Sequence, residues 1–243
     1  MTTEIKAILI IVLITAVVIV GGLSLTKNGP QSPTITINED SLITADNPRQ
    51  TGSEAKIKVV EFADFACPAC AMLAPNLEAA LATNANSIDF AVRLLPIHGE
   101  ESYTSATAAF AAGEQGKFFE YGKILFDKQT EWANKNNKRE LFLTYATTLG
   151  LDIAKFTASI DSKDFQSKVK GILDKDNADA SAMKIASTPT LVIGGTPVVG
   201  VQTTATLDAM LKAEIEKATG TGVDTDGAGA ANSSTTPTLN INQ

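Results

Sequence analysis

The residues best suited to chemistry in this sequence are its only two cysteines, Cys67 and Cys70. An apolar run from Ile57 to Phe62 precedes them, and apolar residues at helical spacing follow them. We therefore expect Cys67 at the start of a helix, where the first backbone N–H groups have no partner within the helix. Pro68 suits the first helical position, because its ring sets a helical φ and it has no N–H to satisfy. This position favours the Cys67 thiolate, which is the reactive form in disulfide exchange.

The spacing of the two cysteines allows a reversible disulfide. Residues three apart share a helix face, so Cys70 should lie beneath Cys67 and form a bond with it. We expect Cys67 to be the exposed nucleophile and Cys70 the buried resolving thiol. The alternatives are a structural disulfide and half of a zinc site. A bridge over so short a loop gains little stability, and zinc needs four ligands where this chain has two cysteines and one histidine.

Composition limits the other possibilities. The chain has 243 residues, enough for one well-cored domain with additions, and its net charge of −7 offers no electrostatic footprint for nucleic acid. We expect no metal, no cofactor and no nucleic-acid partner. The cysteine pair alone does not fix the compartment, because such motifs occur in both cytosolic and exported redox proteins.

The N-terminal region predicts a membrane anchor. Residues 1–6 are a short flank, and residues 7–25 carry no charge and have about the length of a helix that crosses a bilayer. A cleaved signal peptide is the alternative, but its apolar region is shorter and residues 21–24 resemble a cleavage site only weakly. A short N-terminus normally stays inside, so the single-pass protein should hold its catalytic domain on the extracytoplasmic side of the cell membrane.

The next segments predict half of an α/β fold. Residues 26–45 form a linker with a candidate short edge strand at Thr34–Ile37, and turn residues follow as far as Ser53. A strand at Lys56–Phe62, a helix after the cysteines and a strand at Ile88–Leu95 make a βαβ unit with parallel pairing. Pro75 should kink that helix.

The remaining segments predict a helical insert followed by the second half of the fold. Residues from about 100 to 185 contain only helical patterns, with Gly150 as a C-cap. Thr190–Ile193 and Pro197–Val201, separated by a Gly-Gly turn, predict an antiparallel hairpin. A helix at Thr206–Lys217 closes the domain. The composition of residues 219–243 predicts a disordered tail.

Four blocks of the sequence resemble the DsbA-like branch of the thioredoxin superfamily, in its membrane-anchored or exported form. The blocks are Glu61–Cys70, Ala108–Tyr121, Tyr145–Leu151 and Ser187–Thr190, and they stand in family order. The resemblance implies that residues 46–218 form a thioredoxin-like α/β fold with an inserted helical subdomain, preceded by the transmembrane helix.

The resemblance also implies roles for single residues. Thr188-Pro189 is similar to the cis-proline loop that lies beside the cysteines and offers backbone groups to an extended substrate. Pro68 and Ala69 are the other expected substrate contacts. An ordinary trans Pro189 opening an edge strand is the alternative.

Glu61 matches the buried acid of the family beneath the resolving cysteine. A desolvated carboxyl has a raised pKa and can relay a proton to or from Cys70. The alternative is a solvent-facing Glu61. We expect Asp64 to be exposed beyond the strand end, His98 to be an ordinary loop residue, and the charges of residues 168–176 to form a solvated helix face.

The sequence therefore predicts a thiol–disulfide oxidoreductase that donates the Cys67–Cys70 disulfide to reduced exported polypeptides. A quinone-linked membrane partner for reoxidation is implied by the resemblance. Ala69 stands where strongly oxidising relatives often have histidine, so the Cys67 thiolate lacks one stabiliser and a reductase or isomerase stays open. A noncatalytic, membrane-anchored binding module is the alternative from another class.

Overall fold

The computed structural model describes residues 37–220, which contain a five-stranded mixed sheet in the order β1-β3-β2-β4-β5. Strands β2 and β3 pair in parallel, and the other neighbours are antiparallel. The predicted βαβ unit and hairpin are therefore confirmed. The strands are β1 (Arg49–Thr51), β2 (Ile57–Ala63), β3 (Ile88–Leu94), β4 (Thr190–Ile193) and β5 (Thr196–Val199).

Strand β1 was not expected, because its residues lie among turn signals. It pairs with β3 over three residues, Arg49 opposite Ala91 to Thr51 opposite Asp89. All three of its residues are exposed, so no apolar alternation marks them in the sequence. The candidate edge strand lies outside the described residues except for Ile37, which is not in a strand.

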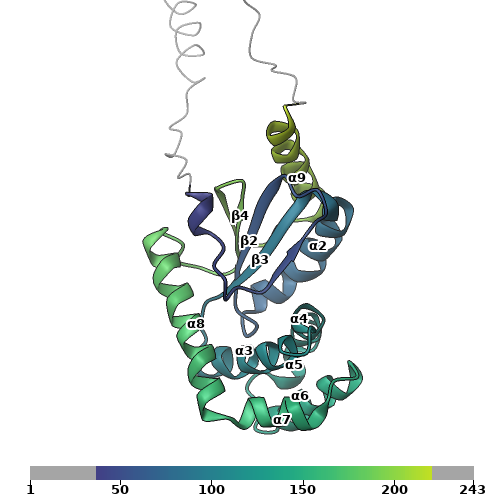
Figure 1. Ribbon diagram of the computed structural model, residues 1–243, viewed down its shortest axis with the longest axis vertical. Helices are drawn as coiled ribbons and strands as arrows, with labels where there is room; N and C mark the ends of the chain where they lie inside the picture. Colours follow the sequence, from purple (N-terminus) through teal and green to yellow (C-terminus); the bar gives the residue numbers. More distant parts are fainter. Residues whose placement is uncertain (1–36, 221–243) are drawn as a thin grey trace, which may run out of the picture. The chain divides into compact units, whose positions relative to one another are not determined.

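Helices cover both faces of the sheet. Helices α2 (Pro68–Asn84) and α9 (Thr204–Thr219) lie on one side, and α8 (Lys163–Ala182) lies on the other (Figure 1). Side chains alternate along the strands accordingly, since Val59 belongs to the core under α2 whereas Val60 and Phe62 belong to the core under α8. Two short 3-10 helices, at Glu39–Ser41 and Ala85–Ser87, complete this part.

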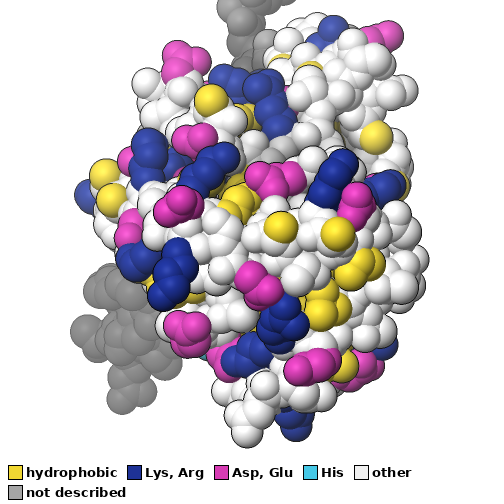
Figure 2. Space-filling view, turned by 60° about the horizontal axis from the view of Figure 1, so that its bottom comes forward, with side chains coloured by type: hydrophobic (Ala, Val, Ile, Leu, Met, Phe, Trp, Pro, Cys, Tyr) yellow, Lys and Arg dark blue, Asp and Glu magenta, His cyan; other side chains and the backbone are white. Residues whose placement is uncertain are grey.

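The predicted helical insert is present. Its helices follow β3 without an intervening strand: α3 (Glu100–Gly113), α4 (Phe118–Asp127), α5 (Gln129–Trp132), α6 (Lys138–Thr148), α7 (Ile153–Asp161) and α8. Trp132 is fully buried in it, and Gly150 after α6 has a φ of +69° as a C-cap requires. Acidic and basic side chains are interspersed on the face drawn in Figure 2.

One buried ion pair fastens α8 to the sheet. Arg93 on β3 is fully buried, and its Nε donates to Asp176 Oδ1 at 2.7 Å. Asp179 also pairs with Arg93, and Asn47 Nδ2 donates to Asp176 at 3.2 Å. The expectation of a solvated face was therefore wrong at Asp176, which is 2% exposed and meets its partner across the fold.

The predicted anchor at residues 7–25 lies outside the described residues, as does nearly all of the predicted tail. Helix α9 runs to Thr219, and Gly220 caps it with a φ of +68°. Within residues 37–220, no helix is both long enough and apolar enough to span a bilayer. Helix α2 continues through Pro75 as one element.

Candidate active site

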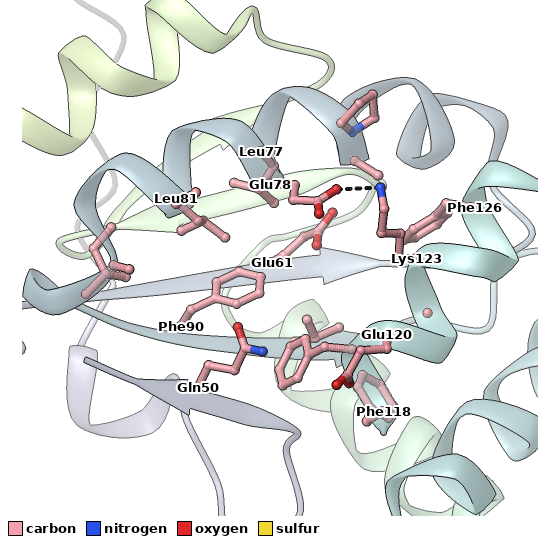
Figure 3. Close-up of a pocket in the computed structure, with 18 of the residues that line it drawn as sticks. Gln50, Glu61, Leu77, Glu78, Leu81, Phe90, Phe118, Glu120, Lys123 and Phe126 are labelled. Carbon is pink, nitrogen blue, oxygen red and sulfur yellow. Dashed lines mark hydrogen bonds and ion pairs between the residues drawn. The ribbon is translucent and has the colours of Figure 1, made fainter. Parts of the chain in front are cut away.

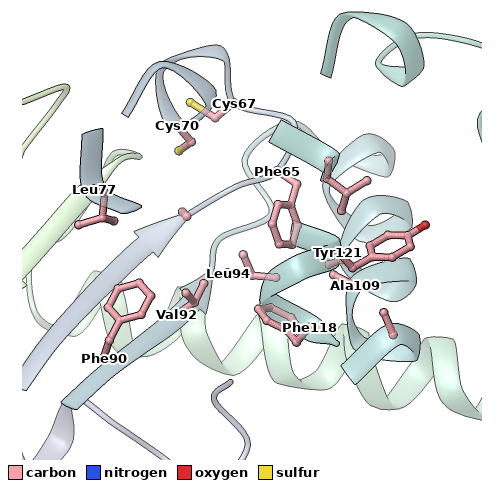
Figure 4. Packing of buried hydrophobic residues seen from close by; sticks show 14 of the residues in the cluster. Phe65, Cys67, Cys70, Leu77, Phe90, Val92, Leu94, Ala109, Phe118 and Tyr121 are labelled. Atoms are coloured by element: carbon pink, nitrogen blue, oxygen red, sulfur yellow. The ribbon is translucent and has the colours of Figure 1, made fainter. Parts of the chain in front are cut away.

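The cysteine pair lies where β2 gives way to α2. Cys67 is the N-cap of α2, with extended backbone angles, and Pro68 is the first helical residue as predicted. The Cys67 N–H donates to the Asp64 carbonyl at 2.9 Å, which closes the turn between strand and helix. Figure 4 shows both sulfur atoms at this helix start. The local sequence therefore positions the reactive sulfur.

The two thiols differ in acidity. A hydrogen bond from the Cys70 thiol is the main reason that the pKa of Cys67 falls to about 5, opposed by burial and assisted by the Thr188 side chain and the N–H groups of Cys70 and Ala69. The same bond, burial and the charge of Glu61 raise the pKa of Cys70 far above its usual range. Cys67 is 6% exposed and Cys70 0%, so Cys67 is less exposed than expected, although it is the more exposed residue of the pair.

The Thr188–Pro189 peptide bond is cis, so the trans alternative was wrong. It brings the Thr188 carbonyl oxygen to 3.6 Å from Cys67 Sγ, where it accepts from the thiol. The Thr188 hydroxyl has no partner among the described residues in this dithiol form, so it is free to donate to a Cys67 thiolate. The Pro189 carbonyl accepts from Gly200 N at 2.9 Å.

Glu61 lies inside the protein, on the β2 face that α2 covers. It is 5% exposed, and burial raises its pKa to about 7. Its Oε1 has no hydrogen-bond partner among the described residues. The solvent-facing alternative was wrong because helices cover both faces of β2. Side chains that alternate along this strand are therefore buried on either face. The catalytic role of Glu61 stays a prediction.

Asp64 is buried rather than exposed, and four donors surround it. Its Oδ1 accepts from Ala66 N at 2.9 Å, and its Oδ2 accepts from Ser102 Oγ at 2.7 Å and from His98 N at 3.2 Å. His98 Nδ1 lies 2.8 Å from the same oxygen. His98 is a loop residue, as expected, but it helps to hold the strand end. Aspartate often accepts from the N–H two residues later in a turn, as Asp64 does from Ala66, and this local preference could have indicated its position.

Sequence reasoning also missed Gln129, through which the helical insert holds the active-site loop. Its Nε2 donates to the carbonyls of Phe65 at 2.7 Å and Cys67 at 3.0 Å. Phe65 packs against Phe126, with ring centroids 5.0 Å apart, and a Cβ on Gly122 would come within 3.0 Å of its ring. No local pattern identifies Gln129, because its partners lie more than 60 residues earlier.

Metal ligands do not gather in the described part of the chain, where no group of three His, Cys, Asp or Glu side chains is arranged to hold an ion. Four of the predicted site residues lie together in the structure: Cys67, Cys70, Glu61 and the cis Pro189.

A family comparison agrees with this geometry. The thioredoxin family matches residues 44–213, which is most of the chain. The chain belongs to the thioredoxin family. Its helical insert and cis-proline loop give it the DsbA-like form of that fold.

Solved structures with the same fold include redox proteins. A thioredoxin-like oxidoreductase from Silicibacter pomeroyi DSS-3 is 25% identical, with a TM-score of 0.60 over 72% of this chain and 96% of that one. The thiol-disulfide exchange protein alpha-DsbA2 from Wolbachia pipientis is 21% identical, with a TM-score of 0.61 over 72% of this chain and 90% of that one. Together with the family match, they support a thiol–disulfide oxidoreductase.

Sequence relatives include a part of a larger protein. The Na(+)/H(+) antiporter NhaA of Herminiimonas arsenicoxydans is 31% identical over 160 residues, which are 66% of this chain and 24% of the antiporter. The chain spans about a quarter of the length of the curated relatives it matches.

Proposed function

We propose that this protein is an extracytoplasmic thiol–disulfide oxidoreductase that passes the Cys67–Cys70 disulfide to reduced exported polypeptides. The observation that carries the proposal is the pKa of Cys67, about 5, at the N-cap of α2 and beside the cis Thr188–Pro189 bond. A stable thiolate means a stable reduced form, and a stable reduced form makes the disulfide a stronger oxidant. Ala69 supplies no side-chain donor, so the thiolate depends on the Cys70 thiol, the Thr188 hydroxyl and backbone N–H groups.

The proposed exchange has two steps. A substrate thiolate attacks Cys67 Sγ, the Cys67–Cys70 bond breaks, and Cys70 leaves as a thiolate. Because burial holds the pKa of Glu61 near 7, its carboxyl has a proton to give to Cys70. A second substrate thiolate then attacks the substrate sulfur of the mixed disulfide, and Cys67 leaves as a stable thiolate. The substrate loses two electrons, and the protein becomes a dithiol.

The surroundings of the pair suit an unfolded polypeptide. Met72 on α2 is 64% exposed, and Val199 and Val201 near the cis-proline loop are 63% and 40% exposed. Exposed apolar side chains of this kind mark interaction surfaces when they gather. Thr188, Pro189, Pro68 and Ala69 provide the proposed backbone contacts to an extended substrate, which read no particular sequence.

The cycle needs an oxidant to restore the disulfide, and we place a quinone-linked membrane protein in that role, as the family resemblance implies. The predicted anchor at residues 7–25 would keep the domain at the extracytoplasmic membrane surface beside such a partner. Exported polypeptides acquire disulfides on that side.

The deciding experiment is the equilibrium potential of the pair, measured on the full-length protein in glutathione buffers with alkylation of the free thiols. We expect a potential well above the thioredoxin value of about −270 mV, with Cys67 alkylated first. A value near that of thioredoxin would favour a reductase. A pair that does not cycle, or a Cys67 that resists alkylation at neutral pH, would favour the noncatalytic binding module.

Trapping separates the two thiols. In Cys70→Ser, the Cys67 thiolate should attack a disulfide of an oxidised model polypeptide and release its second sulfur as a thiolate, so a mixed disulfide should accumulate because the resolving thiol is gone. Cys67→Ser is the matched control and should trap none. Equal trapping by both variants would contradict the assigned roles.

A further inference from the structure

A cavity of about 660 Å³ lies beside the active site, between α2, α4 and the sheet (Figure 3). Cys67 and Cys70 are not among its lining residues, so the cavity is separate from the cysteine pair. Its size falls within the range of small-molecule sites, about 300–1,000 Å³. Its walls are mainly aromatic and aliphatic, and they include Phe65, Phe90, Val92, Phe118, Phe119 and Phe126.

One buried polar group faces this cavity without a partner. Glu61 lines it and points into the space between α2 and the sheet (Figure 3), and Glu61 Oε1 has no hydrogen-bond partner among the described residues. Unpartnered buried polar atoms are uncommon in folded proteins and call for a missing group. When Glu61 is ionised, the group that completes this site is a hydrogen-bond donor to its carboxylate.

The other charged groups of the lining determine the charge of that group. Glu78, Glu120 and Asp127 also line the cavity, and Lys123 is the one basic residue of its lining. Glu120 is paired with Lys117, whose Nζ is 2.7 Å from Glu120 Oε1. Lys123 Nζ is already 2.6 Å from Glu78 Oε2 and 3.6 Å from Asp127 Oδ2. The field inside is therefore negative. An anionic ligand is disfavoured, and a cation is attracted by Glu61 and by the faces of the aromatic rings.

We propose that this cavity binds a small amine, with its protonated amino group paired to Glu61 and an aromatic or branched aliphatic body against the phenylalanine walls. The pairing holds Glu61 in its ionised form. If Glu61 gives its proton to Cys70, which rests on the proposed function, the bound amine slows disulfide donation. The cavity is then a regulatory site next to the dithiol.

Isothermal titration calorimetry on the full-length protein tests the proposal, with phenethylamine as the probe. Phenethyl alcohol has the same body without the charge, and hydrocinnamate carries the opposite charge. We expect the amine to bind at least about tenfold more tightly than the alcohol, which corresponds to about 1.4 kcal/mol, and hydrocinnamate to bind most weakly. Equal binding of amine and alcohol, or no binding of the amine at millimolar concentration, would overturn the proposal and leave the cavity to water.

Two variants locate the binding. Ala74 lines the cavity from α2, so Ala74→Trp should fill it and abolish binding of the amine. Ala79→Trp, on the same helix but outside the lining, is the matched control and should bind like the wild type. Glu61→Gln should keep the cavity but lose the preference for amine over alcohol. Undiminished binding to Ala74→Trp would place the amine elsewhere.

The readout does not depend on turnover. A protein that failed to exchange disulfides could still bind phenethylamine, so failure of the proposed function and failure of this site give different results. A disulfide-exchange assay with phenethylamine then tests the coupling, and we expect slower oxidation of a model polypeptide by the wild type but not by Ala74→Trp. An unchanged rate at saturating amine would contradict the regulatory role.

Discussion

Each face of the central sheet buries an ionisable side chain, but only one of these two side chains has ion-pair partners. Glu61 on β2 and Arg93 on β3 occupy adjacent positions of the paired strands, where Glu61 lies opposite Val92 and Phe62 opposite Arg93. Glu61 points toward α2 and is 5% exposed, and Arg93 points toward α8 and is 0% exposed. Arg93 has two carboxylate partners, whereas Glu61 Oε1 has none among the described residues.

The difference separates a structural charge from a titratable one. Burial raises the pKa of Asp176, but Arg93 and Asn47 oppose that rise, and losing Arg93 leaves a buried charge without compensation. Glu61 has only the cost of burial, so it takes up a proton near neutral pH. In the proposed mechanism, a proton that Glu61 can release next to Cys70 takes part in disulfide exchange, whereas a titrating group under α8 would only weaken the fold.

Breaking the structural pair should give the largest effect. Arg93→Leu leaves the Asp176 carboxylate buried and unpaired, so the free energy of unfolding should fall by about 3–5 kcal/mol in urea titrations at neutral pH. The loss should shrink as the pH falls, because Asp176 then becomes protonated. Arg93→Leu combined with Asp176→Leu should recover most of the loss. The exposed ion pair of Arg139 and Asp161, whose Nη2 and Oδ2 atoms are 2.7 Å apart, provides the control, since Arg139→Leu should leave the urea midpoint unchanged.

Removing the unpartnered carboxyl of Glu61 should change the free energy of unfolding in the opposite direction to Arg93→Leu. The folded protein holds a proton on Glu61 up to about pH 7, whereas the unfolded chain releases it near its ordinary value of about 4.5. Wild-type stability should therefore fall, relative to Glu61→Gln, as the pH rises from about 4.5 to 7, by about 3 kcal/mol in total. Urea titrations of both reduced proteins across this range measure the difference.

The control for that experiment is Glu216→Gln, which removes one exposed negative charge from α9. A constant difference between wild type and Glu61→Gln over the whole range would show that Glu61 does not titrate in this window and would weaken its assigned role.

Asp64 tests whether a partnered carboxylate close to the active site behaves like the Arg93 network. Asp64 accepts hydrogen bonds from the groups around it, and Asp64→Asn would place an amide N–H against one or more of these donors. We therefore expect a loss of about 1–3 kcal/mol in the free energy of unfolding. Ser102→Ala removes only one donor and should cost less. If Asp64→Asn were neutral, the His98 and Ser102 contacts would be incidental.

The smallest effect is expected at Thr188, whose hydroxyl is the other unpartnered buried group beside the cysteines. Thr188→Val removes a donor to the Cys67 thiolate, so the pKa of Cys67 should rise by less than about one pH unit. The pH dependence of thiolate absorbance measures it, and Thr188→Ser should restore the wild-type value. A lower pKa in Thr188→Val would contradict the donor role.

Several features were predictable from the sequence because they are local. The strand before Cys67, the helix start at Pro68 and the spacing of Cys70 all follow from residues within a few turns of one another. The cis state of Pro189 and the burial of Glu61 came instead from the family resemblance, and the structure has both.

Other features depend on residues far apart in the chain, and only the tertiary structure decided them. Asp176 meets Arg93 across 83 positions, and Gln129 meets Cys67 across 62. A charged side chain in a helical pattern could be buried or solvated, and the helix sequence alone does not distinguish the two. A charge is buried only where a partner compensates it, and here that partner lies far away in the chain. Thus the sequence by itself determined the reactive dithiol, and the packing of sheet and insert decided which neighbouring charges are fixed and which can titrate.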